Sequence, residues 1–74
     1  MKKNKVSLIE KMLIKNYSKY YKLAFSYVQN DTDAMDIVKE YAYKAIKNAN
    51  SLKNIYYINT WIYKIVINQC KTFL

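Results

Sequence analysis

The chain has 74 residues and a formal net charge of +8, with no histidine, glycine or proline and a single cysteine, Cys70. This length leaves room for one domain, residues 1–74, with a small core. The lone cysteine excludes an internal disulfide, and the absence of histidine removes the commonest metal ligand, so we expect neither a metal nor a cofactor. Lysines and Glu10 interrupt the apolar runs well before the length of a membrane span, so we expect no export and no membrane insertion, but a cytoplasmic protein.

The periodicity of the apolar residues predicts an all-α fold, a compact bundle of three or four helices. Apolar residues recur at three- and four-residue steps, and the lack of glycine and proline disfavours a β fold with many turns. The first helical region runs from about Ser7 to Val28 and can break near Asn16, where helix propensity is weak. Its expected apolar stripe consists of Val6, Ile9, Leu13, Tyr17, Tyr20, Ala24 and Val28.

Two further helices follow. Asp31 or Thr32 is expected to cap the second, which runs to about Asn48. Its expected buried residues are Ala34, Val38, Tyr41, Ala42 and Ala45, with Ile37 as a further candidate. A polar loop over residues 48–54 follows, from which Leu52 is expected to enter the core. The last helix begins between Tyr56 and Asn59, with Ile58, Ile62, Ile65, Val66 and Phe73 expected to face the core.

The second helix also carries a polar stripe that is acidic in its first half and basic in its second. Helical spacing places these residues on one face: Asp33, Asp36, Glu40, Tyr43, Lys44 and Lys47. Acids near a helix start and lysines near its end suit the helix dipole, so a solvated surface is one explanation. A docking face for a basic partner is the other.

A second polar stripe follows the last helix. Tyr57, Thr60, Lys64, Asn68 and Lys71 share its solvent side. Lysines interleaved with amide and hydroxyl groups can follow a phosphate backbone and hydrogen-bond to bases, and exposed tyrosines can stack on unpaired bases. Trp61 lies at the edge of the apolar face, where it can serve either as core or as a stacking platform. We find no constellation of catalytic residues and expect no enzymatic activity.

Charge is distributed unevenly along the chain. Residues 1–30 carry seven lysines against one acid, residues 31–48 three lysines against four acids, and residues 49–74 three lysines and no acid. A basic chain with one acidic segment suggests a polyanionic partner together with a second, basic partner. Lysines that merely keep a tyrosine-rich domain soluble are the alternative.

Two segments together resemble a known family. Residues 33–40 read Asp-Ala-Met-Asp-Ile-Val-Lys-Glu, and residues 60–65 read Thr-Trp-Ile-Tyr-Lys-Ile, with Asn68 following. The chain from about Ser18 to Phe73 is similar to region 2 of the sigma factors of bacterial RNA polymerase, of the extracytoplasmic-function type. The family's own segments are an Asp-Ala-x-Asp-Ile-Val-x-Glu run and a Trp-Leu-Tyr-Arg-Ile-Ala run.

The resemblance implies a role in transcription initiation. It implies that the second helix docks on the β′ clamp of core RNA polymerase and that the loop and last helix capture the non-template strand of the promoter −10 element. An anti-sigma factor is a further partner that the family admits. The implied polymerase-binding residues are Asp33, Asp36, Ile37, Lys39 and Glu40, where Lys39 replaces the family's usual glutamine. The implied DNA-binding residues are Lys53, Asn54, Tyr56, Tyr57, Thr60, Trp61, Lys64, Asn68 and Lys71.

Other interpretations stay open at this point. The helix-turn-helix of region 4 has no counterpart in the sequence, so the chain is expected to be either a fragment of a longer sigma factor or a protein reduced to region 2. A basic helical adaptor that binds a partner helix is the alternative function. An amphipathic membrane-surface protein is a third, which the basic first helix favours and the acidic second helix disfavours.

Overall fold

The computed structural model describes residues 2–73, with side chains from Lys5 onward, and within that range it contains helices and no strand. The four α-helices are α1 (Lys2–Lys15), α2 (Tyr17–Val28), α3 (Asp31–Lys47) and α4 (Ile58–Phe73). Two 3₁₀ turns, η1 (Ala49–Ser51) and η2 (Ile55–Tyr57), connect α3 to α4. The all-α prediction is confirmed. No helix within residues 2–73 has the length and apolar character needed to cross a membrane.

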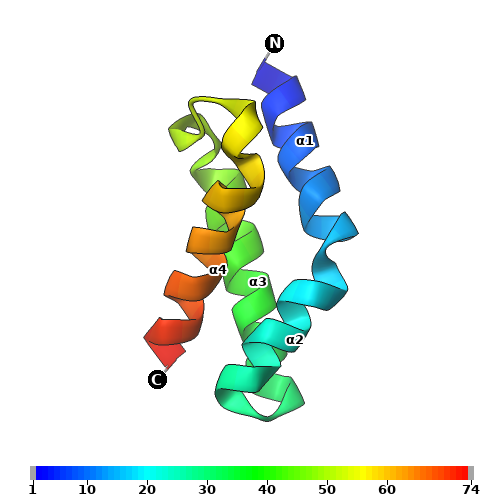
Figure 1. Cartoon of the computed structure of the whole chain (residues 1–74), viewed down its shortest axis with the longest axis vertical. Helices are drawn as coiled ribbons and strands as arrows, with labels where there is room; N and C mark the ends of the chain where they lie inside the picture. Colours follow the sequence, from blue (N-terminus) through cyan, green and yellow to red (C-terminus); the bar gives the residue numbers. More distant parts are fainter. Residues whose placement is uncertain (1, 74) are drawn as a thin grey trace.

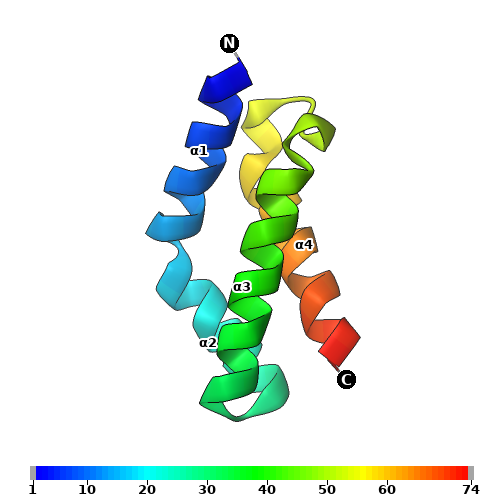
Figure 2. The same cartoon turned by 180° about the vertical axis from the view of Figure 1, so that it is seen from behind.

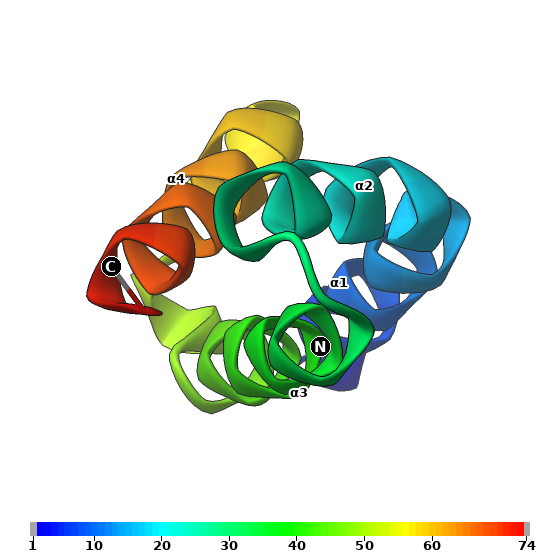
Figure 3. The same ribbon diagram turned by 90° about the horizontal axis from the view of Figure 1, so that it is seen from below.

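The helices lie around one shared core. Figure 1 shows α1 and α2 descending one side in succession, with α3 and α4 beside them and the loop between α3 and α4 at the same end as the N-terminus. Figure 2 shows the other side, with α3 in front, running beside α2 and then beside α1. Viewed along the long axis, the four helices surround a common centre (Figure 3). The molecule is elongated, with extents of 39 × 20 × 18 Å.

Apolar side chains from all four helices fill this core. The fully buried set runs from Ile9 of α1 through Ala24 of α2 and Ile37 of α3 to Ile62 and Val66 of α4. Leu52 of the connecting loop is buried as predicted. Phe73 was predicted to be core but is 37% exposed, because the last turn of α4 extends beyond the buried part of the helix.

The first helical region consists of two helices, α1 and α2, separated at Asn16, where the sequence predicted a possible break. The carbonyl of Met12 accepts from the backbone N–H of Asn16 at 3.0 Å and from its side-chain amide at 3.1 Å, so the Asn16 side chain folds back onto the last turn of α1. The break changes the helical register, and Tyr17, predicted to be part of the apolar stripe, is exposed instead. Its hydroxyl donates to the Met35 sulfur at 3.3 Å. The helix also begins at Lys2, five residues earlier than the start expected near Ser7.

The turn between α2 and α3 uses neither of the predicted caps. Asn30, and not Asp31 or Thr32, is the N-cap of α3, and its Oδ1 accepts from the backbone N–H of Asp33 at 2.8 Å. The same amide donates to the Asp33 carboxylate at 2.9 Å, so the Asn30 side chain bonds both the backbone and the side chain of Asp33. Immediately before it, Gln29 has φ 57°, the left-handed conformation that ends α2.

Replacing Asn30 with alanine should therefore destabilise the protein by about 1 kcal/mol, because one backbone donor of the first turn of α3 loses its acceptor. Thr32→Ala is the matched control, since the threonine lies on the same turn and does not cap. Chemical denaturation of the two variants measures the difference. Equal losses of stability would contradict the assignment of the cap to Asn30.

Tyr41 is the largest fully buried side chain, and its hydroxyl has no hydrogen-bond partner among the residues that the structure describes. Its ring meets that of Tyr20 edge to face at 5.9 Å. Burial raises the pKa of Tyr41 above the ordinary value of 10.0, because the phenolate would lose its hydration. The ring stabilises the fold by packing in the core, whereas burying the hydroxyl destabilises it because the hydroxyl loses its hydrogen bonds to water.

Tyr41→Phe should leave stability at neutral pH unchanged or raise it by about 1 kcal/mol, because it removes a buried polar atom without a partner. Since the pKa of Tyr41 is higher in the folded state than in the unfolded chain, its ionisation makes stability fall as pH rises above 10.0. The variant should show a shallower alkaline loss. Unfolding free energies at neutral and alkaline pH test both parts, and a loss of about 1 kcal/mol at neutral pH would refute the first.

Candidate functional site

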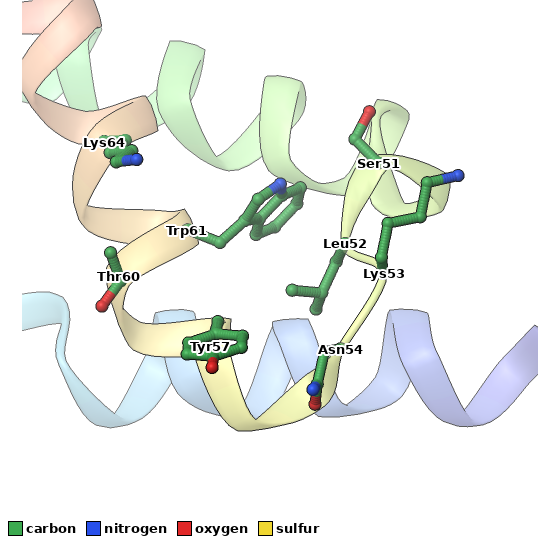
Figure 4. A pocket seen from close by; sticks show the side chains of 8 residues that line it. All are labelled: Ser51, Leu52, Lys53, Asn54, Tyr57, Thr60, Trp61 and Lys64. Carbon is green, nitrogen blue, oxygen red and sulfur yellow. The ribbon is translucent and has the colours of Figure 1, made fainter.

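A pocket of about 430 Å³ opens between the loop after α3 and the start of α4. Figure 4 shows the Trp61 indole reaching from α4 toward the loop, and Leu52 extending from the loop into the space between Trp61 and Tyr57. The floor is thus aromatic and aliphatic, and polar groups stand around it. The lining residues are Ser51, Leu52, Lys53, Asn54, Tyr57, Thr60, Trp61 and Lys64.

Burial and capping hold the loop in this shape. Leu52 is fixed in the core, and Ile58 anchors the start of α4. Between them, Asn54 Oδ1 accepts from the backbone N–H of Tyr56 at 2.9 Å and so caps η2. This bond orients the Asn54 side chain and leaves its amide hydrogens free for a ligand.

The structure brings together six of the nine residues predicted to bind DNA. Lys53, Asn54, Tyr57, Thr60, Trp61 and Lys64 all line the pocket. Tyr56 lies outside it and is 90% exposed on η2. Asn68 and Lys71 are exposed farther along α4 and continue the stripe that begins at the pocket. Ser51 and Leu52 also line the pocket and were not predicted to belong to the site.

Trp61 satisfies both explanations that the sequence left open. Its side chain is partly buried and packs against the core, and it also forms part of the pocket. The ring is therefore held by the fold on one side and is available on the other. A ring fixed in this way loses little conformational freedom when a ligand stacks on it.

The polar stripe of α3, which is acidic in its first half, faces away from the core and is separate from the pocket. Asp36, Lys39 and Glu40 are exposed and can meet a partner. Asp33 is partly buried and already accepts from Asn30. Ile37 is 0% exposed, so its predicted contact with polymerase is corrected: the side chain is core and has no surface to offer.

One polar contact between α3 and α4 was not predicted. Lys44 Nζ of α3 donates to Gln69 Oε1 of α4 at 2.7 Å, and Gln69 is only 5% exposed. The sequence held one signal for Gln69: it continues the i, i+4, i+8 column of Trp61 and Ile65 and should therefore face inward. A buried glutamine needs a hydrogen-bond partner, and Lys44 provides it.

Reactive groups are sparse. Burial raises the pKa of the Cys70 thiol, which favours the protonated, unreactive form. Within residues 2–73, no group of three or more histidine, cysteine, aspartate or glutamate side chains is placed to hold a metal ion. What this surface offers is stacking area, hydrogen-bonding groups and positive charge.

Comparison with known proteins gives one family. The chain matches the family model described as Sigma-70 region 2 over residues 12–74. It is 44% identical to the RNA polymerase sigma factor SigV of Bacillus subtilis (strain 168) over 55 residues, which are 74% of this chain and 33% of that protein. The chain therefore spans about a third of the length of this relative. No solved structure matches significantly.

Proposed function

Because the chain belongs to the Sigma-70 region 2 family, we propose that it binds core RNA polymerase through α3 and holds the opened −10 element of a promoter on the pocket and α4. The proposal concerns transcription initiation and a binding role without catalysis. The observation that carries it is the pocket, in which six residues selected from the sequence alone line one space.

The pocket has the chemistry to hold an unpaired base. Its volume of about 430 Å³ is within the range of small-molecule sites. Trp61 and Tyr57 present aromatic surface, and stacking contributes about 1–3 kcal/mol per base. Asn54 and Thr60 can hydrogen-bond to base edges, while Lys53 and Lys64 can meet the adjoining phosphates. These contributions match the few kcal/mol that removing a base from the stack costs.

The exposed carboxylates of α3 suit a basic partner. Asp36 and Glu40 lie one turn apart on the same side of the helix, with no described partner of their own. Carboxylates accept short, charge-assisted hydrogen bonds from arginine, the contact that the family's β′ clamp interaction needs. Because the core packs behind α3, docking on this face requires no rearrangement of the fold.

The partners of the proposed role follow from these two faces. They are core RNA polymerase, through its β′ clamp, and the non-template strand of promoter DNA. An anti-sigma factor that covers either face is a further proposed partner. With polymerase as its partner, the chain would act in the cytoplasm.

Asp36→Lys should weaken binding to core RNA polymerase about tenfold or more, because a charge that accepts from the partner becomes one that repels it. Glu10→Lys is the matched control: it makes the same charge change at an exposed site on α1. Titration of fluorescently labelled protein with core enzyme measures both affinities. If the folded parent does not bind, the proposed function is wrong, and the helical adaptor becomes the leading alternative.

Lys64→Glu should reduce affinity for an AT-rich single strand and leave polymerase binding unchanged, since it reverses a charge at the pocket and not on α3. Lys22→Glu on α2 is the control for net charge, being exposed and outside the pocket. Fluorescence anisotropy at several salt concentrations separates the two variants. Equal effects would indicate nonspecific charge attraction in place of a defined site.

A further inference from the structure

Lys44 and its neighbour Lys47 differ in the position of the side-chain ammonium group. The Lys44 ammonium crosses from α3 to α4 and donates to Gln69 Oε1 at 2.7 Å. The Lys47 ammonium remains over its own helix, 5.5 Å from the centroid of the Tyr43 ring. Both lysines are exposed and one turn apart, so the difference arises from the buried glutamine opposite Lys44.

The ammonium lies at the level of the polar stripe along the axis of α4, on the side of the helix that faces α3. Helical spacing places Asn68 about 100° around the helix from Gln69. Gln69 directly follows Asn68 and precedes Lys71 by two residues, and both of these are exposed. An ammonium group has three hydrogens, of which Gln69 accepts one. The other two remain available on a side chain that is open to solvent.

The identity of the acceptor also matters. A carboxylate at position 69 would pair with Lys44 and cancel its charge, whereas the neutral amide holds the ammonium and leaves the charge intact. Holding a flexible lysine in place reduces the side-chain entropy that it loses when it binds a ligand. Orientation without neutralisation is the arrangement that a phosphate-binding lysine requires.

We propose that Lys44, positioned by Gln69, is a phosphate-binding residue that extends the DNA surface of α4 onto α3. The inference rests on the proposed function and adds a residue to it. The DNA backbone that follows Asn68 and Lys71 would meet a cation from the neighbouring helix at the same level. The surface would then join two helices that otherwise serve different partners.

The test uses the 74-residue chain and a fork oligonucleotide, a duplex ending in an AT-rich single-stranded overhang. Affinity is measured by anisotropy at several salt concentrations for the parent, Lys44→Gln, Lys47→Gln and Gln69→Glu. Lys44→Gln should weaken binding and reduce the salt slope by about 1, the value for one phosphate contact, while Lys47→Gln should leave the slope unchanged.

Gln69→Glu separates an electrostatic role from a structural one. It keeps an acceptor for Lys44, so a purely structural bond would tolerate it, but it neutralises the cation and should weaken fork binding as Lys44→Gln does. Thermal unfolding of each variant identifies any loss of fold. If Gln69→Glu unfolds the chain, the comparison of Lys44→Gln with Lys47→Gln decides.

The outcomes are distinct. If the parent binds the fork and Lys44→Gln equals Lys47→Gln, the inference is wrong and the proposed function stands. If the folded parent does not bind the fork at all, the proposed DNA role fails and the inference fails with it. A reduced salt slope for Lys44→Gln alone supports both.

Discussion

The packing of α3 against the other three helices is the constraint on which the structure depends. Its buried column includes Ala34, Ile37, Val38, Tyr41 and Ala45, and it meets α1, α2 and α4. Small alanines at both ends of this column allow the neighbouring helices to approach closely, and Tyr41 fills the centre. Only one side of α3 remains for solvent. Its polar stripe is therefore confined to that side, where the acids near the start of the helix also suit its dipole.

The two candidate surfaces follow from this packing and from the short connection to α4. The loop cannot move far, because Leu52 is buried at one end and Ile58 at the other. As a result α4 presents its polar stripe on the side away from the core, and the pocket forms where the loop meets the start of the helix. The chain has a net charge of +8, and its acidic and basic surfaces are separated because the core buries one side of each helix and leaves the other side exposed. The hydrogen bond from Lys44 to Gln69 links the two helices that carry these surfaces.

Helical periodicity was sufficient for the fold class, weak helix propensity indicated the break at Asn16, and the apolar side chain of Leu52 in a polar loop indicated its inward position. These signals were insufficient where several residues could perform the same local task. Asn30 caps α3 although Asp31 and Thr32 have equally suitable side chains, since only the turn geometry decides between them. For Ile37 the family motif indicated a contact surface and periodicity allowed burial, and the packing favours burial. Spacing along α4 predicted that the polar stripe is exposed, as the structure shows. The contribution of Ser51 and Leu52 to the pocket depends on the path of the loop, which periodicity does not encode.

The burial of Leu52 has a consequence for timing. A loop anchored by a core side chain acquires its shape when the chain folds, so the entropy of ordering the loop is lost in folding and not in association. A ligand that enters the pocket meets walls that are already in place. Binding then depends on whether the ligand already presents a group that fits the pocket. Under the proposed function, such a site would capture a base that is already unpaired and would not itself drive the unpairing.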